Sequence, residues 1–189
     1  MGIKRNFLIG EKVYLQSMDA GLYDNEYQDW VNWVNDDEIV DNTGTLYLPT
    51  TEEALRDYIK VNTNKHNIAF FAIRLKENND FIGTTKIGPI DWVNRKAHYG
   101  RLIGNKSYIG KGIGTEVARL ILGYGFKRLN LHWIGTGNFS NNIASIKSNE
   151  KAGLKKLAVI PNQVWSNGKY VDRVIMGITS EEYFDSQNS

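Results

Sequence analysis

The sequence predicts an α/β fold built on a mixed, mostly antiparallel sheet, and three observations support this prediction. Segments 67–75 and 81–90 read as strands and are joined by a short Asn-Asn-Asp turn, so they should pair antiparallel. Segments 156–165 and 170–178 flank a Ser-Asn-Gly turn and give a second hairpin signal. The third observation is a strand–helix–strand unit in the middle of the chain.

This central unit begins with the strand KAHYGRLIG, passes through the glycine-rich loop and helix of YIGKGIGTEVARLILGYGF, and ends with the strand LHWIGTG. A strand that reaches the next strand through a helix of this length makes a crossover, which places 98–104 and 131–137 parallel and adjacent. The helix is recognised by one apolar stripe at i, i+3, i+4 and i+7, formed by Val117, Leu120, Ile121 and Tyr124.

The remaining elements follow from shorter patterns. KVYLQSM at 12–18 alternates apolar and polar residues and predicts a first strand. Aromatic residues at helical spacing predict a helix over 21–34, and Thr50 with Glu53 three residues later is typical of a capping box that opens another helix. NNIASIKSNEKAGL predicts a third helix. We expect one domain over 1–189, with a polar tail at 179–189 that frays.

Composition excludes several classes of function. Hydrophobic residues make up 41% of the chain, which is enough for a packed core. The net charge is only +2, so nothing demands nucleic acid or an anionic membrane as a partner, and we expect neither. The chain has no cysteine and no apolar segment of membrane-spanning length, so we expect a cytoplasmic protein. We also expect a monomer or homodimer and no metal site.

The glycine-rich loop indicates an anion site. A helix start leaves four backbone N–H groups unpaired and carries partial positive charge. Gly110, Gly112 and Gly114 would let those groups turn toward a phosphate, and Lys111 adds a cation. A flexible turn that only separates two elements is the alternative interpretation.

Two common phosphate motifs do not match this loop. A P-loop needs Ser or Thr after its lysine, but Gly112 follows Lys111, so no hydroxyl is placed to hold magnesium. A dinucleotide fingerprint needs a third glycine where Thr115 stands. A kinase-like nucleotide-binding protein is therefore disfavoured.

The chain resembles the GNAT superfamily of acetyl-coenzyme A dependent N-acetyltransferases. The family signature is Arg or Gln, two residues, Gly, one residue, then Gly or Ala, and the matching window here is Ile109 to Gly114, with Ile109 in the place of Arg or Gln. Further similarity is to the branch of ribosomal-protein N-terminal acetyltransferases, which often lacks that first residue. It is carried by WVNWVNDDEIV, GKGIGTE followed by YGF, NIASIKSNEKAGL and GKYVDRVIM, in the expected order.

The resemblance implies a fold with helices on both faces of the sheet and a splayed central parallel pair, between which acetyl-CoA binds. It implies a coenzyme pyrophosphate held by the loop, a pantetheine arm along the strand backbone, and further contacts from the helix that follows. The residues matching these roles are Gly110, Lys111, Gly112, Ile113, Gly114 and Thr115 for the pyrophosphate, Leu102, Ile103 and Asn142 for pantetheine, and Lys147 and Lys151 for the ribose phosphate. Asn142 as a helix cap and a solvated basic face are the simpler interpretations.

Acetyl transfer to an amine needs a base for the ammonium proton and a proton for the departing thiolate. For the base we consider His98, whose ordinary pKa of about 6.5 suits this task, with Asp91 and Glu116 as weaker candidates. Asn149 stands where many family members carry an acidic tyrosine. The resemblance to the ribosomal-protein branch makes Ser145 the candidate acid. A half-exposed histidine and an ordinary helix serine are the competing interpretations.

The acceptor side is expected near the first helix, where Trp30 and Trp33 are candidates, and near Tyr170 of the last hairpin. Aromatic residues at helical spacing are also typical of a core. We predict direct transfer of acetyl to a protein N-terminus, a nucleotide-linked amino sugar, or a polyamine or drug-like amine. A catalytically silent acetyl-CoA sensor is the alternative.

Overall fold

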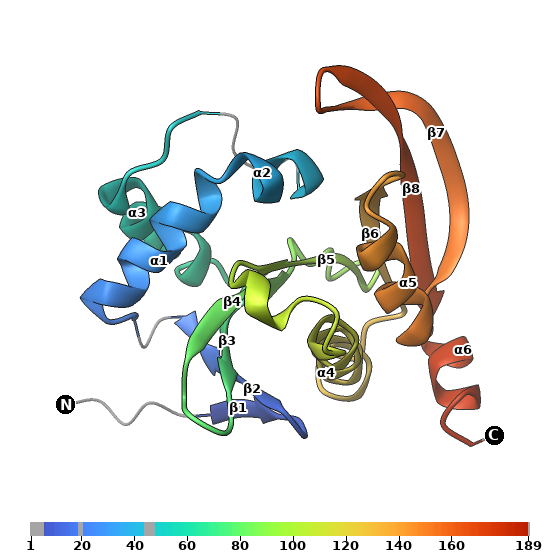
Figure 1. Ribbon diagram of the computed structural model, residues 1–189. Helices are drawn as coiled ribbons and strands as arrows, with labels where there is room; N and C mark the ends of the chain where they lie inside the picture. The colour runs from blue at the N-terminus through green and yellow to red at the C-terminus, as the bar shows by residue number, and fades with distance from the viewer. Residues whose placement is uncertain (1–5, 19–20, 44–47, 189) are drawn as a thin grey trace.

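The computed structural model describes residues 6–18, 21–43 and 48–188. Within these residues, eight strands form one sheet in the order β1-β2-β3-β4-β5-β6-β8-β7 (Figure 1). The strands are β1 Asn6–Ile9, β2 Val13–Ser17, β3 Ala69–Leu75, β4 Phe81–Ile87, β5 Lys96–Ile103, β6 Trp133–Phe139, β7 Lys155–Ser166 and β8 Lys169–Thr179. The α-helices are α1 Asp24–Val34, α2 Asp37–Thr43, α3 Glu52–Thr63, α4 Ile113–Lys127, α5 Ile143–Lys151 and α6 Ser180–Asp185.

The sheet is antiparallel except for its central pair. β5 and β6 run parallel, as predicted, and they pair only from Lys96–His98 to Trp133–Gly135. Both strands continue beyond this point, to Ile103 and Phe139, without pairing with each other. The expected splay is therefore confirmed, and it opens the sheet at its centre.

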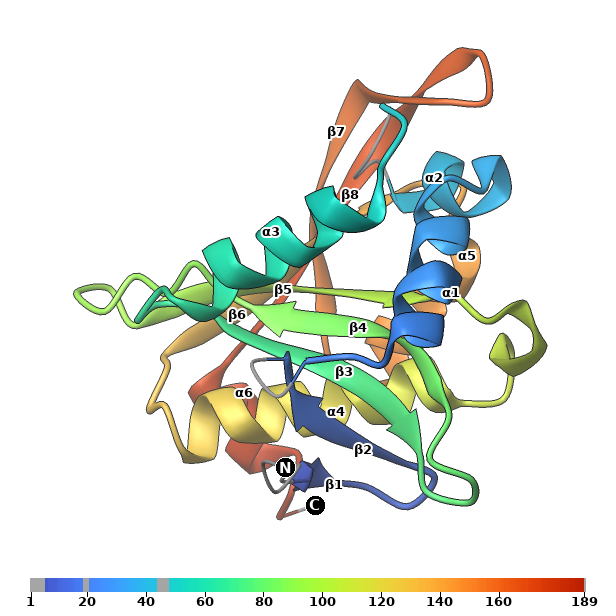
Figure 2. The same cartoon turned by 90° about the vertical axis from the view of Figure 1, so that its left-hand side faces the viewer.

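Helices cover both faces of the sheet, as the resemblance implied. Alternate residues of β3 enter different cores: Phe71 and Ile73 pack into the core under α4, whereas Phe70 and Ala72 pack under α1 and α3. Figure 2 shows α3 on one side of the sheet and α4 and α6 on the other. This alternation is what a strand buried on both faces requires.

Helix α4 forms the centre of the larger core. Val117 and Ile121 are fully buried, and Leu120 and Tyr124 pack partly buried against the same cluster. The predicted apolar stripe thus faces the sheet. None of the helices in the described ranges is both long enough and apolar enough to cross a membrane.

Two expectations, one about the C-terminal tail and one about the start of α3, were wrong. The tail 179–189 was expected to fray, but it begins with α6, because Thr179 and Glu182 form a capping box and Tyr183 packs on Phe126 with ring centroids 4.9 Å apart. A hydrogen bond from Lys155 and the Thr179 backbone N–H hold the pKa of Glu182 at about 2. Helix α3 is capped by Thr51 rather than Thr50.

Candidate functional site

The glycine loop has the backbone geometry of an anion cradle. Gly110 and Gly112 adopt left-handed φ values of 80° and 84°, which side chains with a Cβ rarely tolerate. Gly112 is the N-cap of α4 and supplies no side-chain cap. The first N–H groups of the helix therefore have no partner from the helix itself or from its cap residue. Together these features leave backbone donors without helical or cap partners at the positively polarised end of α4.

A cavity of about 1000 Å³ lies against this helix start. Its walls are the half of β5 that pairs with β4 but not with β6, the glycine loop, α2 and α5. The predicted coenzyme residues that line it are Leu102, Ile103, Gly110, Gly112, Gly114, Thr115, Asn142, Lys147 and Lys151. Lys111 and Ile113 do not line it, because the Lys111 ammonium lies over the Tyr108 ring and the Ile113 side chain is buried in the core. Their backbones remain part of the loop.

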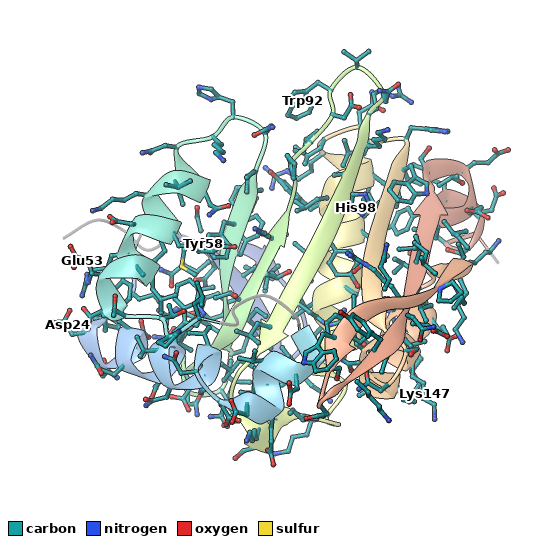
Figure 3. The ribbon with its side chains drawn as sticks, turned by 90° about the horizontal axis from the view of Figure 1, so that it is seen from above. Asp24, Glu53, Tyr58, Trp92, His98 and Lys147 are labelled. Carbon is teal, nitrogen blue, oxygen red and sulfur yellow. The ribbon has the colours of Figure 1, made fainter. Side chains whose placement is uncertain are left out.

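A second cavity, of about 450 Å³, opens between α1, α3 and the centre of the sheet. Trp30, Tyr58 and His98 are among its lining residues. Figure 3 shows His98 on the central strand with Tyr58 of α3 to its left. The two cavities share four lining residues, Arg101, Leu102, Asn142 and Ser145. They therefore meet where β5 and β6 separate.

A buried polar network surrounds this meeting point. Arg101 Nη1 donates to the Tyr99 hydroxyl at 2.8 Å and to Asn149 Oδ1 at 2.6 Å, and the Tyr99 hydroxyl donates to the same amide oxygen. Ser145 Oγ donates to Asn138 Oδ1 at 2.9 Å, and Asn149 Nδ2 donates to that oxygen at 3.1 Å. The network links β5, β6 and α5 across the splay and holds Ser145 between the two cavities.

One donor in this network has no protein acceptor. The Asn138 side chain is 6% exposed, and within the described part of the chain its Nδ2 has no hydrogen-bond partner. Leaving a buried amide donor unpaired costs about 1–3 kcal/mol. Because Asn138 lines the second cavity, a bound carbonyl or hydroxyl group is the natural partner for this donor.

Ser145 and Asn142 also have structural tasks. Asn142 is the N-cap of α5, and its Oδ1 accepts from the Ser145 backbone N–H at 3.0 Å. The capping interpretation of Asn142 is therefore confirmed, and the same residue lines both cavities. Its cap fixes the first turn of α5 and with it the position of the Ser145 hydroxyl.

Among the residues that line the second cavity, His98 is the one whose ordinary pKa, about 6.5, lies nearest to neutral pH. Partial burial, followed by the positive charges of Arg173 and Lys96, lowers its pKa below the ordinary value of 6.5. The ring packs edge-on against Trp133 with centroids 5.2 Å apart. The imidazole is therefore neutral at neutral pH, which is the form that accepts a proton.

Two of the expected acceptor residues lie elsewhere. Trp33 packs on Phe81 with ring centroids 5.2 Å apart and touches Gly104, and Tyr170 is 62% exposed beside Trp165 on the β7–β8 hairpin. Neither lines either cavity. Trp33 follows the helical spacing because it belongs to the packing of α1, which is the competing interpretation of these aromatic residues.

Sequence reasoning missed three residues of the network, Tyr99, Arg101 and Asn138. Their side chains lie on the sheet face opposite to His98, because side chains alternate along β5. The only signal in the sequence for Tyr99 and Arg101 was their spacing of two positions, which places both side chains on the same face of the strand. Burial raises the pKa of Tyr99, so its hydroxyl keeps its proton at neutral pH.

The chain matches known acetyltransferases in sequence and in fold. Residues 22–155 match the family described as "Acetyltransferase (GNAT) domain". The probable N-acetyltransferase YjcK of Bacillus subtilis is 30% identical over an alignment of 141 positions, and the match covers 67% of this chain and 76% of YjcK. The SPbeta prophage-derived uncharacterized N-acetyltransferase YokL of the same organism is 28% identical over 148 residues, covering 78% of this chain and 82% of YokL.

Among solved structures, spermidine N-acetyltransferase from Vibrio cholerae, in complex with CoA and spermine, superposes with a TM-score of 0.80. It is 19% identical, and the match covers 93% of this chain and 99% of that one, so it shows the fold. None of these three relatives carries the name of a ribosomal-protein acetyltransferase. By its family match and its sequence relatives, the chain belongs to the GNAT family and is an acetyl-CoA-dependent N-acetyltransferase.

Proposed function

We propose that this enzyme moves acetyl from acetyl-CoA to a primary amine by direct transfer while both substrates are bound. The observation that carries the proposal is the meeting of two cavities at the splay of β5 and β6, with Ser145 lining both. One cavity offers a phosphate cradle and the other a chamber of small-molecule size. Two substrates bound from opposite sides would meet at this point.

The larger cavity suits the coenzyme. The backbone N–H groups at the start of α4 would bind the pyrophosphate, and Lys147 and Lys151 would contact the phosphate on the ribose. The backbone of Leu102 and Ile103, which β6 leaves unpaired, would bind the pantetheine arm as a strand does. When bound, acetyl-CoA supplies the activated acetyl group as a thioester.

The protein's own groups would manage the protons. An alkyl ammonium has a pKa of about 10.4, so neutral His98 would take one proton before the amine attacks. The new N–C bond forms as the C–S bond breaks, and Asn138 Nδ2 would hydrogen-bond the carbonyl oxygen as charge develops there. The Ser145 hydroxyl would protonate the departing sulfur, and the proton released by the new amide replaces the one it gives.

The acceptor class is open to direct test. The ribosomal-protein branch favours a peptide N-terminus, and the Vibrio cholerae structure is named for spermidine. We expect thiol release from acetyl-CoA with at least one member of a panel of N-terminal peptides, amino sugars and polyamines. Binding of acetyl-CoA without thiol release with any amine would instead identify a silent sensor.

The role of Ser145 has its own test. Replacing Ser145 with Ala should lower kcat about 100-fold and leave the Kd of CoA within about twofold, because the hydroxyl acts on the sulfur and not on the coenzyme phosphates. Tyr99→Phe removes the second hydroxyl of the network and serves as the comparison. If Tyr99→Phe abolishes turnover and Ser145→Ala does not, Tyr99 is the acid and Ser145 is not.

A further inference from the structure

The second cavity is lined by cations. Lys86, Arg101 and Arg173 all line it, together with His98. Among the described residues that line this cavity there is no aspartate or glutamate. A cavity that binds a polycation would be expected to present carboxylates. The positive charge of this cavity therefore disfavours a polycationic acceptor.

The strand register places three of these groups on one face of the sheet. Lys86 pairs with the residue two positions after His98 in β5, so the two side chains project from the same face. In β6, Gly135 pairs with His98 and Phe139 pairs with Arg173. Gly135 and Phe139 are four positions apart and so lie on the same face of the sheet. Lys86, His98 and Arg173 therefore project from the face that α1 and α3 cover.

No described carboxylate neutralises these cations. Lys86 Nζ donates to the Tyr58 hydroxyl at 2.8 Å, and the hydrogen bonds of Arg101 go to neutral oxygens. In the part of the chain that the structure describes, neither Lys86 nor Arg173 forms an ion pair. The nearby acidic residues of α2, which are Asp37, Glu38 and Asp41, line the other cavity, and Glu38 is paired with Lys106.

Several like charges around one cavity repel each other and attract an anion. The effect on an acceptor has two parts. A polyamine would bring more positive charge into the chamber, whereas a phosphate or carboxylate would form charge-assisted hydrogen bonds with Lys86 and Arg173. The same positive field favours the neutral form of the attacking amine, which is the reactive form.

Resting on the proposed function, we infer that the acceptor is a small primary amine that also carries a phosphate or carboxylate group. Lys86 and Arg173 hold the anionic group, and they line the second cavity without lining the first. The amine end reaches Ser145 at the splay. The chamber of about 450 Å³ accepts a molecule the size of an amino sugar phosphate.

The test compares matched acceptors. Thiol release from acetyl-CoA is measured with glucosamine 6-phosphate against glucosamine, 4-aminobutyrate against butylamine, and spermidine. We expect kcat/KM to be at least about tenfold higher for the anionic member of one pair than for its neutral partner, and spermidine to be poorer than that member. The first pair reports on phosphate and the second on carboxylate.

Two charge-removing variants locate the effect. Lys86→Met and Arg173→Met should each raise the KM of the favoured anionic acceptor about tenfold or more and leave that of its neutral partner nearly unchanged. Lys65→Met removes the same charge from an exposed lysine outside both cavities and should change neither. Arg173→Glu should improve spermidine relative to the anionic acceptor. Urea midpoints confirm that each variant is folded.

Two failures are distinguishable. Turnover of neutral amines or spermidine with no preference for anionic ones overturns the inference and leaves the proposed function standing. If no amine is acetylated, the proposed function fails, and calorimetry with CoA-loaded protein decides the inference. Tighter binding of glucosamine 6-phosphate than of glucosamine, lost in Arg173→Met, supports the anion site, and equal binding overturns it.

Discussion

His98 is the residue whose charge state should shape the pH dependence of the enzyme. Burial and the neighbouring cations Arg173 and Lys96 lower its pKa. If His98 is the base, as we propose, protonation removes the lone pair that accepts the ammonium proton, so kcat/KM should rise with pH through this lowered pKa. We expect the midpoint of the acidic limb to lie below the ordinary histidine pKa of about 6.5. A profile of kcat/KM against pH measures it.

The variant His98→Gln tests whether His98 produces this acidic limb. His98→Gln should lose the limb and slow the reaction about 100-fold near neutrality, because general-base catalysis is worth about 10²–10⁴-fold. Asp91→Asn at the neighbouring loop is the comparison, and it should keep the limb. An unchanged profile in His98→Gln would remove the histidine from the mechanism.

A second residue-scale prediction concerns the buried pair of Glu26 and Arg74. Arg74 is fully buried, Glu26 is 6% exposed, and the two side chains share hydrogen bonds of 2.5 and 2.8 Å. Gln16 Oε1 accepts from Arg74 Nε at 2.7 Å. Glu26→Ala leaves a buried guanidinium without its counter-charge, so the free energy of unfolding should fall by about 3–5 kcal/mol.

Urea unfolding measures this loss. The matched control is Glu53→Ala, which removes an exposed glutamate from another helix and should cost less than about 1 kcal/mol. Equal losses in the two variants would mean that the pair contributes little to folding. Sequence reasoning did not predict this pair, because 48 residues separate its members and only the tertiary fold brings them together.

At the scale of elements, the start of α4 carries the most specific prediction. Gly112→Val places a β-branched side chain at a φ of 84°, which strains the loop and turns its N–H groups away from the cavity. We expect the Kd of CoA to rise at least about tenfold, as measured by calorimetry. The melting temperature should show that the variant still folds.

A strain control separates the two effects of that substitution. Gly21 has a φ of 74° and open space around its Cβ direction, and it lies outside both cavities. Gly21→Val should lower stability by a similar amount without changing the affinity for CoA. Unchanged affinity in folded Gly112→Val would contradict the cradle.

Elements with a local signal were predicted well. The helix stripe of α4, the β7–β8 turn and the crossover all depend on residues close together in sequence, and the structure contains them. Strand β1 and helix α2 were not predicted, and α6 was taken for a fraying tail. These elements are short, and α6 owes part of its stability to Tyr183, whose buried position depends on Phe126 far away in the sequence.

The site shows the same division. The glycine loop is a local pattern, so its left-handed backbone and its place at a cavity could be anticipated. The network of Tyr99, Arg101 and Asn149 depends on which strand faces α5. A single sequence does not reveal this packing. The charge of the second cavity depends on strand register, and for that reason only the structure brings Lys86 and Arg173 together.

At the scale of the whole molecule, two cavities meet at the splay of the sheet, and we propose that each binds one substrate. The start of α4, together with α2 and α5, lines the larger cavity, and α1 and α3 line only the smaller one. They meet only at the gap between β5 and β6. A change confined to one cavity should therefore affect one substrate alone, provided that it leaves the residues at the gap in place.

Gly100 offers this change, because it lies in β5, lines the second cavity, and has nothing within 4 Å of where its Cβ would stand. Gly100→Leu should fill the second cavity, where we propose that the amine binds, and lower kcat/KM for the amine about 100-fold, while calorimetry finds the Kd of CoA unchanged. Ala158→Leu, on exposed strand β7, adds a leucine without filling either cavity and should leave both values as they are. Loss of CoA binding in folded Gly100→Leu would show that the two cavities do not act separately. Unchanged kcat/KM would mean that the amine binds outside this chamber.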